Sequence, residues 1–242
     1  MKILIIQHIA CEPAGIYEDI LVEKGAQIHR VEIDAGQQLP DWRGVDAILA
    51  MGGPMSVNDD DTLPWLSAEK RWVREAVHAG RPFWGVCLGA QLLAASLGAR
   101  VYSGAKPEIG TMPVYLTAEA QRDAVFSVVP SKFLTFQWHG ETFDLPEGAV
   151  LLASSPAYPN QAFRWKEAAY GLQFHLEVSA DMAEQWSQVP NYAAALERVL
   201  GAGAARNVVG EVLQDQATLH SYARRMFENW LQAWGGRIEA KL

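Results

Sequence analysis

Two cysteines and a few histidines and carboxylates are the residues of this chain that could carry chemistry. Cys87 lies in the segment Gly85-Val86-Cys87-Leu88-Gly89, where an apolar, strand-like run meets a helix-forming run. This Gly-x-Cys-x-Gly pattern is typical of a nucleophile elbow, with sulfur in place of a serine oxygen. The glycines leave room for close chain approach, the helix N-terminus favours a thiolate, and the Leu88 N–H is free to face a developing oxyanion. The alternative is an ordinary buried core cysteine.

A second motif places a histidine and a carboxylate two residues apart. In Gly171-Leu172-Gln173-Phe174-His175-Leu176-Glu177, a candidate strand ends with His175 and Glu177. Residues i and i+2 of an extended chain project to the same side, so both can reach one site. The imidazole could take the thiol proton while the carboxylate orients the ring. We therefore predict a triad of Cys87, His175 and Glu177, with an incidental surface pair as the alternative.

Two further segments could serve the same nucleophile. Met51-Gly52-Gly53-Pro54-Met55-Ser56 follows an apolar run directly, which predicts a loop at the carboxyl edge of a sheet, where ligand sites gather. Adjacent glycines there can turn a second backbone N–H toward a substrate, although Gly-Gly-Pro alone is only a turn signal. Gln91 lies four residues after Cys87, on the same helix face. Its amide can bind a polar substrate or simply solvate the helix start.

The hydrophobic pattern predicts the elements that position these residues. Apolar runs alternate with amphipathic segments in the first hundred residues, which favours an α/β fold whose mostly parallel sheet is covered on both faces. After Ala99, short apolar runs separated by Pro, Gly, Asn and Ser predict added antiparallel hairpins. The expected strands are 3–6, 28–33, 45–51, 83–86, 110–116, 133–138, 150–153, 162–165 and 170–174, and the expected helices include 17–24, 72–77 and 91–97.

The C-terminal region has a different pattern. After a break at 201–205, apolar residues recur at three- and four-residue spacing, which predicts an amphipathic helix. We expect its apolar face to pack on the body of the same chain, with a dimer contact as the alternative. This predicts a catalytic domain over 1–195 and a helical extension over 196–242. The apolar residues are Leu219, Tyr222, Ala223, Met226, Phe227, Trp230, Leu231 and Trp234.

Composition narrows the classes of partner. The net charge of −8 and the absence of Lys/Arg runs argue against nucleic acid and anionic membrane as partners. The first apolar run is too short for a signal peptide or a membrane span, so a cytoplasmic protein is expected. The segment Asn58-Asp59-Asp60-Asp61 lacks the spacing of a calcium loop and predicts a solvated loop, not a metal site. No elbow surrounds Cys11, which we interpret as a bystander.

Together the three glycine-containing motifs resemble those of the class I, triad-type glutamine amidotransferases. The similarity is strongest to stand-alone proteins like the amidotransferase domain of GMP synthase. The resemblance implies a flavodoxin-like, three-layer α/β/α fold without a cofactor. It also implies hydrolysis of the glutamine side-chain amide through a γ-glutamyl thioester. Cys87 would attack the amide, His175 would move the proton, and Glu177 would orient His175.

The resemblance also assigns the supporting residues. The N–H groups of Gly53 and Leu88 would form the oxyanion hole, and Gly52 and Gln91 would help to bind the substrate. The segment Gln137-Trp138-His139-Gly140-Glu141 resembles the part of the family that lines the glutamine pocket. His139 is therefore a pocket candidate, with a purely structural histidine as the alternative.

The substrate and the partner stay open at the level of sequence. No P-loop pattern occurs, so ammonia released at Cys87 would pass to a separate synthetase subunit. Alternatively, the chain is a free-standing γ-glutamyl hydrolase or peptidase with the same triad. A non-catalytic binding or stress-response protein is the third hypothesis. The loop Gln7–Gly15 follows the first expected strand and either borders the same pocket or is a plain connection.

Overall fold

The apolar runs form one mixed sheet. The computed structural model describes residues 1–239 of the chain, and within them nine strands follow the order β2-β1-β3-β4-β9-β8-β7-β5-β6. Pairing is parallel from β2 to β9 and antiparallel from β9 to β6. The strands are β1 (Lys2–Gln7), β2 (Gln27–Glu32), β3 (Ala47–Ala50), β4 (Phe83–Val86), β5 (Val101–Leu116), β6 (Lys132–Phe143), β7 (Ala149–Ser154), β8 (Ala162–Trp165) and β9 (Ala169–Leu172).

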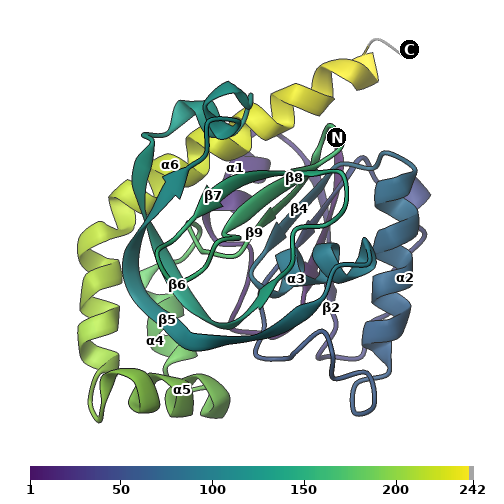
Figure 1. Cartoon of the computed structure of the whole chain (residues 1–242). Coiled ribbons are helices and arrows are strands. Elements are labelled where there is room, and N and C mark those ends of the chain that lie inside the picture. The colour runs from purple at the N-terminus through teal and green to yellow at the C-terminus, as the bar shows by residue number, and fades with distance from the viewer. Residues whose placement is uncertain (240–242) are drawn as a thin grey trace.

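The antiparallel part is larger than the sequence suggests. The prediction of a mostly parallel sheet holds only from β2 to β9, because short connections such as that between β7 and β8 permit only antiparallel pairing. β5 and β6 extend well beyond the runs expected at 110–116 and 133–138, and both curve around one end of the molecule (Figure 1). Their pairing shifts register between Ser103 and Glu108. The mixed α/β class is therefore confirmed, with a curled sheet.

Side chains of the buried strands point alternately to the two faces of the sheet, and each face carries its own hydrophobic core. Ile3 and Ile5 of β1 belong to one cluster of buried apolar residues, whereas Leu4 and Ile6 belong to a second. Such alternation follows from the two-residue repeat of a strand whose faces are both covered. The first cluster continues into α1, α4 and α6, and the second into α2 and α3. Helices therefore cover both faces of the parallel part.

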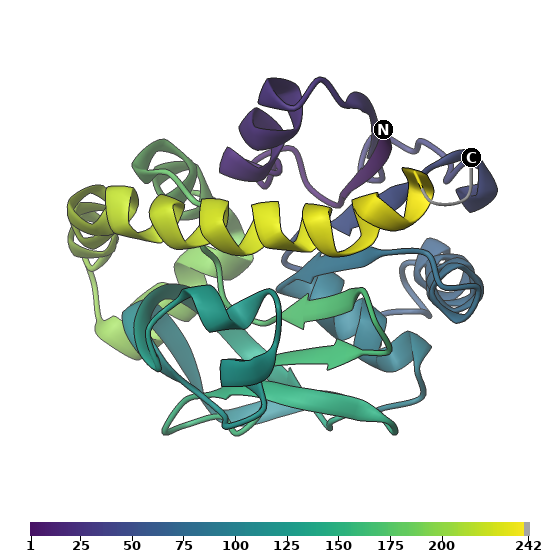
Figure 2. The same cartoon turned by 90° about the horizontal axis from the view of Figure 1, so that it is seen from above.

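The helices complete the arrangement. Figure 2 shows α6 crossing the face of the sheet opposite to that covered by α2 and α3. The helices are α1 (Ile16–Glu23), α2 (Trp65–His78), α3 (Leu88–Ser96), α4 (Ala180–Trp186), α5 (Pro190–Leu200) and α6 (Ala205–Glu239), with short 3-10 turns at Trp42–Gly44, Ala120–Arg122 and Phe126–Val128.

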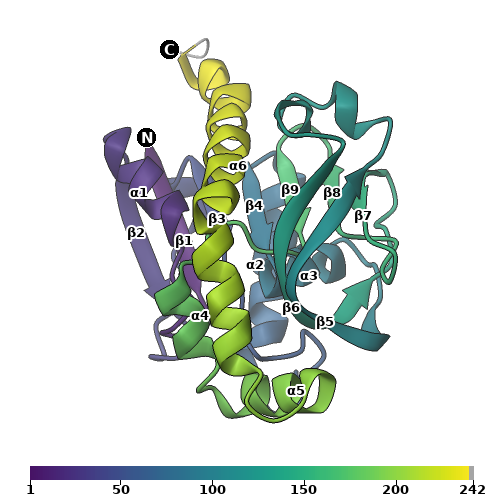
Figure 3. The same ribbon diagram turned by 90° about the vertical axis from the view of Figure 1, so that its left-hand side faces the viewer.

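The apolar face of α6 packs on the same chain, as the sequence predicts. Phe227 and Trp230 each lie 5.5 Å, ring to ring, from Trp84 of β4, and the Trp230 indole N–H donates to the Ala168 carbonyl. α6 runs beside α1 and α4 (Figure 3). None of the helices in the described residues is long and apolar enough to cross a membrane. The proposed division at residue 195 stays a prediction.

Candidate active site

The turn between β4 and α3 holds Cys87 in an unusual backbone conformation. Its φ is +51° and its ψ is −107°. Among the described non-glycine residues, only Cys87 and Lys166 have a positive φ. Such geometry costs an L-residue of the order of 1–3 kcal/mol and persists only where the surroundings enforce it. Here the Cys87 N–H donates to the Leu172 carbonyl of β9 over 2.8 Å, which fixes the turn to the neighbouring strand.

The glycines on either side of Cys87 are sterically required. A Cβ on Gly85 would lie 2.5 Å from the carbonyl oxygen of Gly89, and a Cβ on Gly89 would lie 2.0 Å from the carbonyl oxygen of Ala50. Both obstacles are backbone atoms, which cannot move aside as a flexible side chain can. The spacing of the motif thus follows from how closely α3 approaches β3 and β4.

His175 and Glu177 form a buried pair. His175 Nδ1 lies 2.6 Å from Glu177 Oε1, and the second carboxylate oxygen accepts the Leu176 backbone N–H. Both side chains are about 1% exposed. The carboxylate therefore fixes the ring orientation and leaves Nε2 as the nitrogen that can serve Cys87.

The backbone that positions this pair differs from the expected strand. β9 ends at Leu172, and His175 lies in a bent segment beyond it. His175 instead forms an isolated bridge with Phe136 of β6, with N–O distances of 3.0 and 2.8 Å. The expected strand end at Phe174 was therefore wrong, because the chain leaves β8 to reach β6.

The electrostatics favour a protonated His175. Burial lowers its pKa, but the charge of Glu177 and the hydrogen bonds to Cys87 and Glu177 raise it more, so the pKa lies well above its ordinary value. A raised imidazole pKa favours transfer of the thiol proton to His175. The three predicted triad residues are thus brought together in one site.

Two buried amides connect to the nucleophile. Gln173 Nε2 donates to Cys87 Sγ over 3.7 Å, and the side-chain oxygen Oε1 of Gln173 accepts from Gln91 Nε2 over 3.1 Å. Gln91 therefore lies beside Cys87, as its helical spacing predicts, and also orients Gln173. Gln173 was missed as a site residue because its only sequence signal was its place in the His175 motif.

The oxyanion candidates lie at the turn and at the neighbouring loop. Leu88 begins α3, so its N–H has no partner within the helix, and Gly53 lines the pocket that contains Cys87. His8 helps to hold the Gly53 loop, because its Nδ1 lies 2.9 Å from the Met51 carbonyl oxygen. A Cβ on Gly52 would lie 2.0 Å from Glu12 Oε2. A side chain at Gly52 would therefore have to displace the Glu12 carboxylate.

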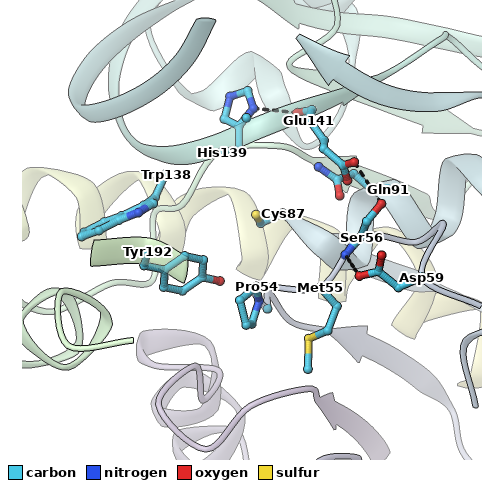
Figure 4. Close-up of a pocket in the computed structure, with 12 residues that line it drawn as sticks. Pro54, Met55, Ser56, Asp59, Cys87, Gln91, Trp138, His139, Glu141 and Tyr192 are labelled. Carbon is cyan, nitrogen blue, oxygen red and sulfur yellow. Dashed lines mark hydrogen bonds between the residues drawn. The ribbon is translucent and has the colours of Figure 1, made fainter. Parts of the chain in front are cut away.

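The pocket at Cys87 has two chemically distinct sides. Its volume is about 270 Å³. In Figure 4, Ser56, Asp59 and Glu141 lie on one side of Cys87, and Trp138 and Tyr192 lie on the other. Ser56 Oγ donates to Glu141 over 2.9 Å, and its N–H donates to Asp59 over 2.8 Å.

Burial and the charge of Asp59 raise the pKa of Glu141. Asp59 and Glu141 therefore form an acidic subsite that a cationic group would stabilise. The sequence predicts a solvated loop at Asp59, and it shows Glu141 only as the last residue of the segment Gln137–Glu141. The sequence does not indicate that β6 brings Glu141 to the loop before α2, because this contact depends on the tertiary structure.

His139 lines the pocket and also has a structural role. It lines the pocket, but its Nδ1 lies 2.8 Å from the Glu141 carbonyl oxygen and its Nε2 lies 3.2 Å from Glu108. Glu108 also accepts hydrogen bonds from Ser155 and Gln161. Because both nitrogens are engaged, His139 supports the pocket wall, and the two alternatives raised by the sequence apply together.

Glu12 and Tyr192 are further residues that sequence reasoning missed. Glu12 lies in the loop after β1 and is about 1% exposed, and it accepts a hydrogen bond from the hydroxyl of Tyr192 on α5. The loop Gln7–Gly15 thus reaches Tyr192 of the pocket wall through Glu12, and whether it helps to select a substrate stays a prediction. Cys11 in the same loop has a pKa raised to about 11 by burial and the charge of Glu12, which disfavours a thiolate there.

Comparison with known proteins establishes the family. Residues 17–186 match the model of the class I glutamine amidotransferase family, so the chain belongs to that family. A glutamine amidotransferase-like protein of Salmonella typhimurium, YfeJ, is 30% identical over 188 residues, which cover 76% of this chain and 79% of YfeJ. The GMP synthase of Thermomicrobium roseum is 38% identical over 133 residues, covering 54% of this chain and 23% of that protein.

Solved structures agree with this assignment. A glutamine amidotransferase from Thermotoga maritima superposes with a TM-score of 0.85 and 31% identity, covering 96% of this chain and 98% of that one. One from Methylobacillus flagellatus gives 0.84 and 30%, covering 96% and 95%. The chain spans less than a third of the GMP synthases it matches, and most of the length of YfeJ.

Proposed function

We propose that this protein hydrolyses the side-chain amide of glutamine, with Cys87 as nucleophile, His175 as proton carrier and Glu177 as the group that orients His175. The observation that supports this most is the strained elbow at Cys87 beside the buried His175–Glu177 pair. We also propose that the parallel part of the sheet is the flavodoxin-like layer of a three-layer fold, since β2-β1-β3-β4-β9 has the corresponding strand order. A cytoplasmic location stays part of the proposal.

The proposed reaction has two halves. With the Cys87 proton already held by His175, Cys87 Sγ attacks the amide carbon, and the N–H groups of Gly53 and Leu88 stabilise the oxyanion. His175 then gives that proton to the amide nitrogen, the C–N bond breaks, and ammonia leaves a γ-glutamyl thioester. A water molecule attacks the thioester and loses a proton to His175. The C–S bond breaks, glutamate leaves, and the proton returns to Cys87.

The two sides of the pocket support a substrate with an amino group. The α-ammonium group of glutamine would face Asp59 and Glu141, which lie on the opposite side of Cys87 from Tyr192 (Figure 4). In this orientation the γ-amide would lie at the sulfur. Gly52, Gln91 and the wall at His139 would complete the substrate contacts.

We also propose a use for the ammonia that the reaction releases. The relatives named GMP synthases extend far beyond the matched part. We propose that the acceptor reaction for the ammonia of this protein is carried out by a separate synthetase subunit. The second candidate is a γ-glutamyl hydrolase or peptidase that uses the same three residues without a synthetase partner.

The test is a substrate panel with purified protein. Ammonia release from glutamine and amine release from γ-glutamyl amides are measured for the wild type and for Cys87→Ser. We expect glutamine turnover in the wild type and none in the variant. Failure to release ammonia or amine from every γ-glutamyl compound would overturn the proposal in favour of a binding protein. Turnover that rises with a neighbouring synthetase would support the subunit role.

A further inference from the structure

Two side chains from opposite ends of the chain meet at the pocket, and both lie outside the segment that matches the family model. That segment covers residues 17–186, whereas Glu12 precedes it and Tyr192 follows it. The Tyr192 hydroxyl donates to Glu12 Oε1. This contact ties α5 to the loop after β1, and Tyr192 lines the pocket.

Tyr192 is held firmly by its surroundings. Its ring lies 5.7 Å from the ring of Trp138 and 6.3 Å from that of Trp186. Burial raises the pKa of Tyr192 well above its ordinary value, and the charges of Glu12 and Cys87 add to this. The phenol therefore stays neutral and serves as the hydrogen-bond donor to Glu12.

The side of the pocket on which Tyr192 lies is also the side of the catalytic histidine. Trp186 packs edge-on against His175 with ring centres 4.8 Å apart, and Tyr192 packs on Trp186. A Cβ on Gly52 would lie close to both Glu12 Oε2 and His175 Cε1, at 2.0 and 3.3 Å. Glu12 thus borders His175, and Tyr192 lies next to Trp186, which packs on His175, whereas Asp59 and Glu141 lie on the other side of Cys87 from Tyr192 (Figure 4).

The chemistry places the leaving group on that same side. His175 must give a proton to the departing nitrogen, so this nitrogen faces His175 when the C–N bond breaks. A substituent on the nitrogen would extend further in the same direction, toward the aromatic wall of Trp138 and Tyr192. The acidic side cannot accommodate it, because the amino end of the substrate occupies that side.

We propose that Tyr192, fixed by its hydrogen bond to Glu12, is a specificity-determining wall that restricts the enzyme to primary γ-amides and excludes N-substituted γ-glutamyl compounds. This inference rests on the proposed glutamine hydrolysis and names its substrate class. Glu12 acts as a positioning residue through Tyr192. The wall favours a glutaminase over a γ-glutamyl peptidase.

The first test compares glutamine with γ-glutamyl methylamide, which adds one methyl group to the leaving nitrogen. We expect the ratio of kcat/KM for the methylamide to that for glutamine to rise about tenfold or more in Tyr192→Ala, since one methyl in a tight pocket is worth about 10–200-fold. Tyr192→Phe and Glu12→Gln keep the ring and should raise the ratio by a smaller factor. An unchanged ratio in all three variants would overturn the proposal.

A matched control variant distinguishes a specific effect of Tyr192 on the pocket from a general loss of stability. Tyr222 of α6 packs its ring on Phe133, outside the pocket lining. Tyr222→Ala should lower stability without changing the substrate ratio, and a ratio that moves as far as in Tyr192→Ala contradicts the proposal. Should Tyr192→Ala fail to fold, Tyr192→Phe and Glu12→Gln carry the same test.

A second readout does not depend on turnover. Alkylation of Cys87 is followed by peptide mass spectrometry with small iodoacetamide and with bulky N-phenylmaleimide. Tyr192→Ala should increase the relative rate of the bulky reagent, and Tyr222→Ala should not; equal ratios in both variants would contradict the wall. If glutamine is not hydrolysed at all, the proposed function fails, while the alkylation ratio still decides whether Tyr192 limits access to Cys87.

Discussion

The elbow at Cys87 and the Glu12–Tyr192 contact serve one pocket but are built in different ways. The elbow is local: five consecutive residues, two of them sterically required glycines, create the strained turn between β4 and α3. The contact joins side chains 180 positions apart and depends on the docking of α5. The reactive end of the pocket is therefore encoded in a short motif, and the selecting end is encoded in the tertiary structure.

This difference predicts that substitutions in the elbow abolish hydrolysis, whereas substitutions in the Glu12–Tyr192 contact change which γ-glutamyl substrates are hydrolysed. Removing the nucleophile has the largest effect. Cys87→Ala should lower kcat for glutamine by at least about 10⁴-fold, because the remaining site can bind but not form a thioester. Ammonia release measures this, with circular dichroism as the control for folding. Retention of more than about a hundredth of the wild-type rate would contradict the assignment.

Glu177→Gln tests the orientation of the base. The variant keeps the size of the side chain but removes the charge that raises the His175 pKa, so kcat should fall by about 10²–10⁴-fold. NMR titration should show a lower His175 pKa than in the wild type. A rate within threefold of the wild type, or an unchanged His175 pKa, would show that Glu177 does not act on His175.

Gly89→Ala tests the close approach that defines the elbow. The new Cβ would meet the Ala50 carbonyl oxygen at 2.0 Å, so we expect a loss of about 3 kcal/mol in the free energy of unfolding. Gly210→Ala is the matched control, because nothing lies within 4 Å of its added Cβ on α6. It should gain up to about 1 kcal/mol from helix propensity. Urea unfolding measures both, and similar effects at the two sites would contradict the steric account.

Glu12→Gln tests the cost of a buried carboxylate at the contact. Burial raises the Glu12 pKa to about 7, with Glu177 adding to this and His175, Tyr192 and His8 opposing it. Because the folded-state pKa exceeds the unfolded one, wild-type stability should fall as pH rises from about 4.5 to about 7, by about 3 kcal/mol. The glutamine variant should lack this component. Urea unfolding at about pH 5 and about pH 8 compares the two, and identical pH responses would contradict a buried carboxylate.

The sequence could predict what local chemistry specifies. The strand Phe83–Val86, its turn at Cys87 and the helix after it follow from one motif, and α6 follows from its apolar periodicity. The position of His175 could be predicted only in part, since its bend depends on a bridge to Phe136 that no local pattern signals.

The pocket walls required the tertiary structure. Glu141 meets Ser56 only because β6 extends past its apolar run, and Tyr192 meets Glu12 only because α5 packs beside the loop after β1. A lone tyrosine in a helix or a lone glutamate in a loop has no sequence signature of a binding site. Such residues become visible only when their burial and partners are known.

Covalent capture at Cys87 tests the proposed chemistry most directly. The protein is treated with 6-diazo-5-oxo-L-norleucine, an electrophilic analogue of glutamine, and its peptides are mapped by mass spectrometry. We predict one adduct, on Cys87, whose formation is slowed by excess glutamine and abolished by Cys87→Ser. No adduct on Cys87, or equal labelling of Cys11, would contradict a glutamine-binding site at this elbow.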